Sequence, residues 1–491
     1  MRYSCLNIRV VLLLALCLAL PTVAFASGGD GGGHHDMFAF IMLELTIVIA
    51  VAMFGRWAAR QVNQPTVLGE LLGGVIIGNL GVWFGLPFFQ IVMNMDIAGA
   101  ITREAWSTGQ SFVDAAHHLF PAAVNIPESA HAQIVELLSG PIAPRLIVMT
   151  IAIWIFSNLG VILLLLMVGL ESSVTEMKRS GFTALMVALS GVVAPIALGY
   201  GAGVWLLPEA GMPAHLFIAA TLCATSVGIT ARVLKDMGKL SLPEAKVILG
   251  AAVIDDILGL VILAVVVGII ASGSVNLAEV GRIALLSLGF IAVVMILGER
   301  IAAGGVRLFA RIEQQHLRLL FPIGLAFVMA WLANQIELAT IVGAFAAGLV
   351  LNDVYFSDDG KKQKLEETLA PLEAIFAPVF FVLMGMQVDL ATFTDLGTLA
   401  LAGALCVVAI VSKVVTGFAA GRGMDRLSIG FAMVPRGEVG LIFASIGKGL
   451  GVVSDSIFAA IVIMIMVTTF VAPIALRWSL TREHNSAAGQ D

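Results

Sequence analysis

Two adjacent carboxylates lie inside a long apolar stretch, and their setting points to chemistry. Asp255 and Asp256 interrupt the run from Gly250 to Leu260, in which every other residue is apolar or glycine. A charged side chain at the centre of a bilayer costs about 2.5–3.5 kcal/mol on insertion scales, so such residues mark ion or proton pathways. Adjacent helical residues point about 100° apart, so one carboxylate can face an ion while its neighbour faces a basic partner. The pair indicates an intramembrane cation site, with ion pairing for packing alone as the alternative.

Basic residues that can neutralise one of these aspartates lie in two other apolar segments. Lys413 stands in the middle of one segment, and Arg436 stands beside Glu438 where another segment is interrupted. We predict that Lys413 pairs with Asp255 and that Asp256 binds the ion. Arg436 and Glu438 are predicted to compensate the charges of the broken helix, in preference to binding the ion directly.

A further interrupted segment supplies hydroxyl oxygens. Thr225 and Ser226 belong to the stretch from Thr221 to Thr230, where small polar residues break an apolar span. Hydroxyls and freed backbone carbonyls are oxygen ligands of the kind that replace the water around a monovalent cation. We expect Thr225 and Ser226 to contribute ligands, with hydroxyl bonding back to their own helix as the competing interpretation.

A buried carboxyl group can bind a proton or a cation, and the two compete. Burial favours the protonated form, whereas a bound cation stabilises the ionised form. Competition of this kind at Asp256 is the core of antiport. Asp255 and Lys413 should titrate as a coupled unit. We hypothesise that Lys413 releases the second proton of the cycle if the pair opens when the ion binds.

The composition of the chain places these residues in a membrane. Of the 491 residues 59% are apolar and 12% are charged, and the mean hydropathy is +1.01. Soluble proteins contain about 25% charged residues. Repeated apolar stretches of about 20 residues predict membrane-spanning helices. The basic residues lie in short loops and form no stripe, so no nucleic-acid partner is expected.

Thirteen spans are predicted, from 37–54 to 454–476, in an all-α polytopic membrane protein. Lysine and arginine are concentrated in alternate loops, which predicts a periplasmic N-terminus and a cytoplasmic C-terminus in a bacterial inner membrane. Two triples of spans, at 181–272 and 395–476, then run in opposite senses, and each has an interrupted middle span. Interrupted helices at corresponding positions of inverted repeats point to a transport site near the midplane. We therefore expect crossed discontinuous helices.

These motifs resemble the monovalent cation/proton antiporter-2 family, the bacterial sodium or potassium/proton exchangers, from about residue 40 to 475. The resemblance is carried by the Asp255–Asp256 pair, by Lys413 and by four stretches of sequence, namely 159–171, 224–230, 378–386 and 435–440. It implies a homodimer in which a mobile core domain carries the site across the membrane in an elevator-like movement. Asp256 matches the ion-binding carboxylate of the family, and Asp255 and Lys413 match its salt-bridged partners.

The same resemblance implies the cargo. An aspartate pair is typical of electrogenic members, which exchange Na⁺, or Li⁺ or K⁺, for H⁺, and no cofactor or resident metal is expected. Membrane lipid surrounds such a protein, and no enzymatic activity is expected of it. Two features depart from the family pattern: the apparent leader peptide, and the long polar segment that follows the second span.

The leader and the family pattern together predict the domain organisation. The first 26 residues have a basic start, a short apolar core and an Ala-Phe-Ala ending, which is typical of a signal peptide. The predicted order is signal peptide 1–26, periplasmic tail 27–36, first part of the dimerisation domain 37–171 with a periplasmic insert 88–144, first half of the core domain 172–273, linker helix and cytoplasmic loop 274–318, second part of the dimerisation domain 319–392, second half of the core domain 393–477 and cytoplasmic tail 478–491.

Three alternative functions remain open from the sequence, and a non-transporting receptor is the least supported of them. The nearest is a potassium efflux system or a channel-like cation transporter of the same superfamily. An intramembrane aspartyl protease is more distant, because its two carboxylates must converge and these two are adjacent on one helix. Outside the aspartate pair, Glu44, Glu70 and Glu337 lie in or near span ends, where placement at the membrane surface accounts for them.

Overall fold

All regular secondary structure in the described part of the chain is helical, as the sequence predicts. The computed structural model describes residues 37–62, 65–120, 129–171, 181–226, 229–230, 233–234, 237, 239, 242–272, 277–311, 316–336, 338–351, 364–421 and 423–487. The predicted signal peptide 1–26 and tail 27–36 lie outside these residues, as does Glu337. The prediction of an all-α polytopic membrane protein is confirmed.

Ten described helices are long and apolar enough to cross a membrane. They are α2 (Met37–Gln61), α3 (Thr66–Trp83), α9 (Ala143–Glu171), α11 (Gly181–Leu206), α14 (Pro243–Ser272), α15 (Leu277–Phe309), α16 (Leu317–Gln335), α18 (Leu365–Met386), α19 (Leu396–Thr416) and α22 (Asp455–Ala487). The other three predicted spans contain shorter helices: α12 (Gly211–Cys223), α17 (Thr340–Val350), and α20 (Arg426–Ala432) with α21 (Glu438–Gly449). The count of thirteen spans therefore stays a prediction.

The chain divides into two compact units. Unit 1 comprises residues 1–158 and 378–390, and unit 2 comprises residues 159–377 and 391–491. These units do not coincide with the predicted dimerisation and core domains, because α15, α16 and α17 are grouped with the core helices in unit 2. The predicted division of the chain into two domains remains a prediction.

In unit 1, α2 packs along α3 at a very short distance. The backbones meet at Gly55 and Gly69, where a Cβ atom on either residue would overlap the other helix. Two carboxylates expected near the membrane surface are buried between helices in this unit: Glu44 is 5% exposed and Glu70 is 1% exposed. Glu70 forms an ion pair with Arg56 across the two helices. Both side chains are buried because their helix faces are packed against other helices, and their placement near the membrane surface stays a prediction.

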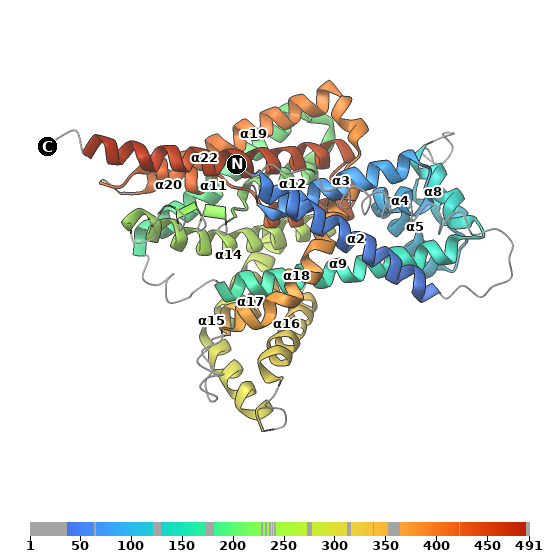
Figure 1. Ribbon diagram of the computed structural model, residues 1–491, viewed down its shortest axis with the longest axis horizontal. Helices are drawn as coiled ribbons and strands as arrows, with labels where there is room; N and C mark the ends of the chain where they lie inside the picture. Colours follow the sequence, from blue (N-terminus) through green and yellow to red (C-terminus); the bar gives the residue numbers. More distant parts are fainter. Residues whose placement is uncertain are drawn as a thin grey trace. The chain divides into compact units, whose positions relative to one another are not determined.

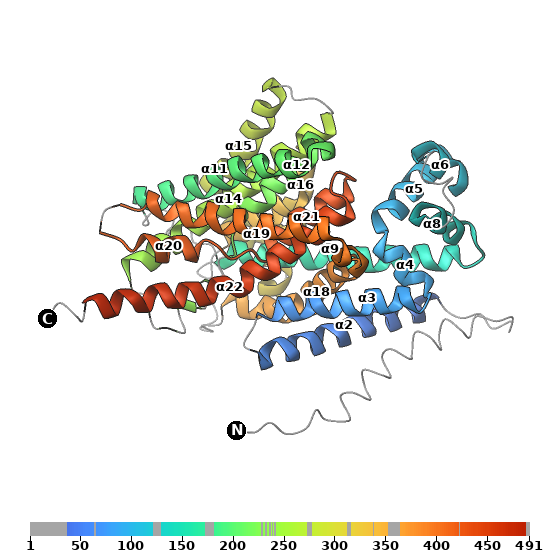
Figure 2. The ribbon, with the colours of Figure 1, turned by 90° about the horizontal axis from the view of Figure 1, so that it is seen from above.

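The predicted insert of unit 1 is a cluster of short helices. It contains α4 (Pro87–Met93), α5 (Met95–Thr108), α6 (Phe112–Leu119) and α8 (Ala130–Ser139), which Figure 2 shows gathered together. The side chain of Ser111 accepts a hydrogen bond from a backbone N–H in the first turn of α6, and Ser129 does the same for α8. Such caps satisfy N–H groups that have no partner within the helix.

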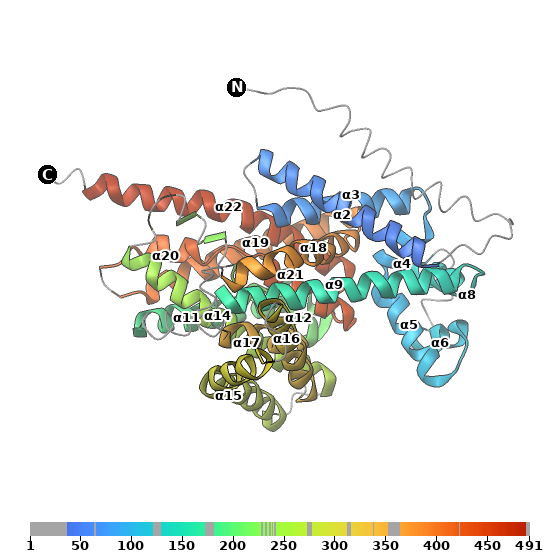
Figure 3. The same ribbon diagram turned by 60° about the horizontal axis from the view of Figure 1, so that its bottom comes forward.

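Unit 2 contains two groups of helices, each with a buried apolar cluster. In the first group α15, α16 and α17 pack together, as Figure 3 shows, and bury Val294, Ala326 and Ala347. The second group consists of α11, α12, α14, α19, α20, α21 and α22, which pack together; α21 is labelled in Figure 2 and the others in Figure 1. Its buried residues include Val187 and Ile248. This second group positions the predicted site residues.

The interruptions within the second group have local causes. α12 ends at Cys223, and Ala224 follows with an extended backbone at ψ 140°. α20 ends at Ala432, three residues before Pro435. Proline provides no backbone N–H and disfavours helical geometry in the residue before it. Helix resumes at Glu438, the first residue of α21. Both middle elements of the predicted triples are thus discontinuous.

Candidate functional site

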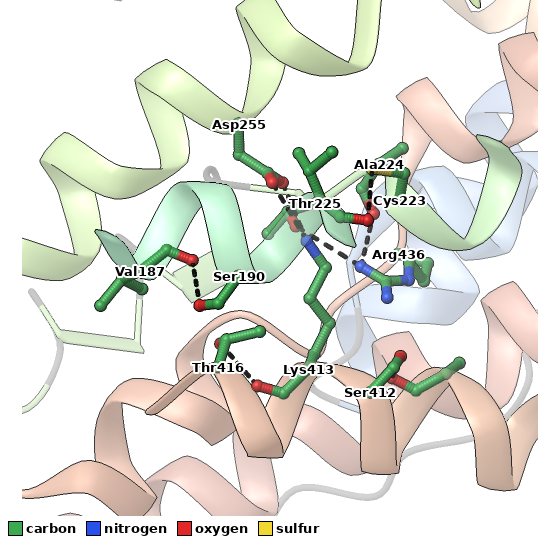
Figure 4. A network of polar contacts seen from close by, with 12 residues as sticks. Val187, Ser190, Cys223, Ala224, Thr225, Asp255, Ser412, Lys413, Thr416 and Arg436 are labelled. Carbon is green, nitrogen blue, oxygen red and sulfur yellow. Dashed lines mark hydrogen bonds and ion pairs between the residues drawn. The ribbon is translucent and has the colours of Figure 1, made fainter. Parts of the chain in front are cut away.

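An ion pair at the centre of unit 2 joins α14 to α19. The ammonium nitrogen of Lys413 lies 3.2 Å from Oδ1 and 3.0 Å from Oδ2 of Asp255, and both side chains are fully buried. Figure 4 shows Lys413 reaching from its helix toward this carboxylate. The structure thus brings together the two residues that the sequence pairs. Because Lys413 contacts both oxygens of Asp255, its positive charge compensates the charge of that residue.

The backbone of α11 closes one side of this ion pair. A Cβ atom placed on Gly191 would lie 3.3 Å from Oδ1 of Asp255 and 3.3 Å from the Lys413 nitrogen. Both α14 and α19 pack against α11. A residue without a side chain is therefore what lets the pair approach this helix. Nothing in the sequence distinguishes Gly191 from any other small residue in a membrane span.

Asp256 follows Asp255 on α14 and is itself buried, with 7% of its surface exposed. The site therefore holds two adjacent carboxylates, both removed from bulk water, and the Lys413 ammonium lies on the first of them. Burying an ionised carboxylate is costly unless a cation or a proton compensates its charge. This arrangement suits an exchange of cation and proton at Asp256.

The two interrupted elements cross beside the ion pair. The backbone N–H of Ser226 donates to the carbonyl oxygen of Pro435 at 2.9 Å, and the hydroxyl of Thr230 donates to the carbonyl oxygen of Ala432 at 2.6 Å. A Cβ atom on Gly437 would approach Ser226 to 2.8 Å, so the extended segments are in close contact. Backbone groups released from one broken helix are therefore satisfied by the other, as membrane burial requires.

Thr225 and Ser226 lie at this crossing and are 3% and 1% exposed. They occupy the extended segment after α12, where their backbone is not held by helical hydrogen bonds. The hydroxyl of Thr225 lies 3.4 Å from Nη1 of Arg436. The structure thus gathers both hydroxyl residues into the same buried region as Arg436.

Arg436 compensates the end of the other broken helix. Its Nη1 donates to the carbonyl oxygen of Ala224 at 2.5 Å, directly after the last residue of α12. The C-terminal end of a helix carries a partial negative charge, so a guanidinium there is favourable. The side chain is fully buried, and its Nε and Nη2 make no hydrogen bond with the described residues. Glu438, which was predicted to act together with Arg436, is the first residue of α21.

Two further residues contribute polar groups to this buried region, and the sequence did not predict them. The thiol of Cys223 lies 3.8 Å from the carbonyl oxygen of Val192 and ends α12 next to the crossing. The hydroxyl of Thr469, on α22, donates to the carbonyl oxygen of Arg436. A polar Thr468–Thr469 pair within an apolar span was the only available signal for the second of them.

Comparison with known proteins assigns this chain to a family. Residues 115–482 match the sequence model of the family described as "Sodium/hydrogen exchanger, transmembrane". The chain belongs to the sodium/hydrogen exchanger family. The matched range includes both triples of helices and every residue predicted for the site. The resemblance to cation/proton antiporters is therefore confirmed.

Individual relatives agree with this assignment. The chain is 36% identical over 448 residues to a protein of Synechocystis named "High-affinity Na(+)/H(+) antiporter NhaS3", with 90% of each chain covered. It is 34% identical over 330 residues to the "Na(+)/H(+)-K(+) antiporter GerN" of Bacillus cereus, which covers 66% of this chain and 82% of that protein.

A solved structure has a similar fold. The sodium proton antiporter MjNhaP1 of Methanocaldococcus jannaschii matches 91% of this chain and 99% of its own, with a TM-score of 0.58 at 15% identity. At this level of identity the likeness concerns the fold alone. It supports a polytopic helical architecture for this chain.

Proposed function

We propose that this exchanger-family chain carries sodium and protons in opposite directions, with Asp256 as their shared ligand. The observation that carries the proposal is the buried Asp255–Lys413 ion pair, which stands beside a second buried carboxylate at the crossing of two broken helices. The names of the two relatives, both sodium/proton antiporters, support sodium as the cargo. Thr225 and Ser226 are proposed to add oxygen ligands from the extended segment.

Competition for one carboxylate provides the coupling. A sodium ion stabilises the ionised form of Asp256, whereas burial without the ion favours its protonated form. The site therefore crosses the membrane carrying either a cation or a proton. Asp255 stays ionised and paired with Lys413 during the whole transport cycle, unless ion binding opens the pair. In that case Lys413 releases a second proton, and two protons move for each sodium ion, which makes exchange electrogenic.

The moving part is proposed to be the second helix group of unit 2, in an elevator-like movement. Four of its helices, α11, α14, α20 and α22, share one buried apolar cluster, and a backbone hydrogen bond joins the two crossing segments, which supports their moving as a body. The proposed core domain consists of residues 172–273 and 393–477. Residues 37–171 and 319–392 are proposed to form the dimerisation domain of a homodimer. In a bacterial inner membrane, the N-terminus would be periplasmic and the C-terminus cytoplasmic.

Cation-evoked proton movement in proteoliposomes of the full-length protein tests this function. Sodium, lithium and potassium are added in turn to wild type, to Asp256→Asn and to Asp114→Asn, which changes an exposed aspartate of α6. We expect exchange with sodium in wild type and Asp114→Asn, and only the background of empty vesicles in Asp256→Asn. Unaltered exchange in Asp256→Asn would move the ion site elsewhere.

A potassium-driven exchange is the second candidate. The name of the Bacillus cereus relative includes K(+), which is the observation that favours it. Proton movement with potassium alone would select this candidate over sodium. Cation flux that does not depend on the pH gradient would favour a channel-like transporter.

A further inference from the structure

Glu44 of α2, in unit 1, is a buried carboxyl that the proposed exchange does not use. It is 5% exposed, and neither of its carboxylate oxygens has a hydrogen-bond partner among the described residues. It is also the only charged residue between Met37 and Gly55, so no neighbour within that stretch of its helix neutralises it. A buried polar group without partners requires a physical explanation, since most such groups are hydrogen-bonded.

The helices packed around Glu44 offer few groups that could neutralise it. α2 and α3 contact each other at Gly55 with Gly69, and the side chain of Val51 lies against Gly73. This antiparallel register places Glu44 level with the apolar Leu80. The polar groups of α3 are engaged elsewhere, because Glu70 is paired with Arg56 and the amide nitrogen of Asn79 donates to two carbonyl oxygens.

The remaining charge beside this face is Arg145 of α9, also in unit 1. Its guanidinium lies 3.2 Å from the centroid of the Phe40 ring, one helical turn before Glu44. No ion pair joins Arg145 to Glu44 in the described structure. The charge of Arg145 is therefore positioned over an aromatic face, one turn away from the carboxyl group.

The surroundings of Glu44 thus favour a neutral carboxylic acid. Burying an ionised carboxylate without donors costs far more than burying the neutral acid. We propose that Glu44 is a second proton-binding site, whose proton is separate from those exchanged at Asp256, and that its loss at alkaline pH slows exchange. An ionised Glu44 must draw Arg145 away from Phe40 or admit water between α2 and α3. The first change removes the contact between Arg145 and Phe40, and the second separates two helices whose backbones touch at Gly55 and Gly69.

Infrared difference spectra of the purified full-length protein in lipid test the proton site directly. At neutral pH the wild-type minus Glu44→Gln spectrum should contain the carbonyl stretch of a protonated carboxylic acid. The matched wild-type minus Glu70→Gln spectrum should contain the stretches of an ionised carboxylate, because Glu70 is paired with Arg56. Carboxylate stretches in the Glu44 difference spectrum would overturn the proposal.

The pH profile of exchange tests the consequence, and this step rests on the proposed function. Sodium-evoked proton movement is measured from neutral to alkaline pH for wild type, Glu44→Gln and Glu70→Gln. We expect Glu44→Gln to keep its rate at alkaline pH where wild type and Glu70→Gln decline. Identical profiles for wild type and Glu44→Gln would overturn the link to exchange. If wild type moved no protons, the proposed function would fail while the infrared spectra still decided the proton site.

Discussion

Each unit of the chain holds an interhelical ion pair, and the two pairs differ in their access to water. In unit 2, Asp255 and Lys413 are both fully buried and lie against the backbone of Gly191. In unit 1, Glu70 is buried but the side chain of Arg56 is 27% exposed. The first pair joins α14 to α19, next to the segments where two other helices are interrupted. The second pair joins α2 to α3.

Under the proposed function, this difference separates a pair that takes part in exchange from a pair that joins two helices. Removing two charges completely from water costs several kcal/mol per ion, which their attraction offsets only with good geometry. A buried pair therefore adds little net stability to the fold, but the loss of one partner is strongly destabilising. Where water reaches one partner, as at Arg56, it can solvate part of the charge that is left behind, so losing that partner should destabilise the fold less.

The largest expected effect comes from removing one partner of the buried pair. Lys413→Met leaves Asp255 as an uncompensated buried charge, which should destabilise the fold by about 3–5 kcal/mol. The double variant Lys413→Met with Asp255→Asn should recover most of this loss. Thermal unfolding of the purified protein in one detergent measures all of these variants.

Arg56→Met is the comparison for the pair in unit 1. Arg56→Met leaves Glu70 buried, but water reaches the position of Arg56 and can solvate part of that carboxylate, so the loss should be smaller than in Lys413→Met. Equal losses in Lys413→Met and Arg56→Met would show that burial does not distinguish the two pairs.

A smaller effect is expected from crowding the buried pair without removing a charge. A methyl group on Gly191 would lie 3.3 Å from an atom of each partner, and overpacking of this kind costs about 1–3 kcal/mol. Gly191→Ala should therefore reduce the exchange rate in proteoliposomes. Gly201→Ala, on the same helix with nothing within 4 Å of the added atom, is the matched control and should exchange at the wild-type rate.

The smallest effect concerns Asp395, which caps α19 outside the membrane span. Hydrogen bonds from the backbone N–H and the hydroxyl of Thr398 lower the pKa of this carboxyl below its ordinary 3.8. A lowered pKa in the folded state adds stability above the ordinary value and loses it as the pH falls through the folded value. Asp395→Ala should melt slightly below wild type at neutral pH, and the gap should shrink below pH 3.8. A gap that widens in acid would contradict this cap.

The main partners of the site could be predicted from sequence because charged residues are rare in membrane spans. Once Asp255 and Asp256 stand in an apolar run, Lys413 and Arg436 are nearly the only basic residues deep enough to meet them. The interrupted segments were recognisable for a related reason, since Pro435 cannot continue a helix. The helical fold and the family followed from the same signals.

The rest of the site depends on contacts between distant segments. Arg436 reaches the carbonyl of Ala224 on another broken helix, more than two hundred residues away in the chain. Its closeness to Glu438 in sequence suggested compensation within its own element. The burial of Glu44 likewise depends on which face of α2 meets α3, and a single charge near a span end does not reveal that.

The most direct test of the account is the pH dependence of sodium binding to the purified wild-type protein. If one proton and one sodium ion compete for Asp256, the apparent Kd for sodium should rise about tenfold for each unit of acidification below the pH at which the site takes up its proton. Asp256→Asn should show no such binding. An apparent sodium Kd that stays constant across the acidic range would contradict competition at a single carboxylate.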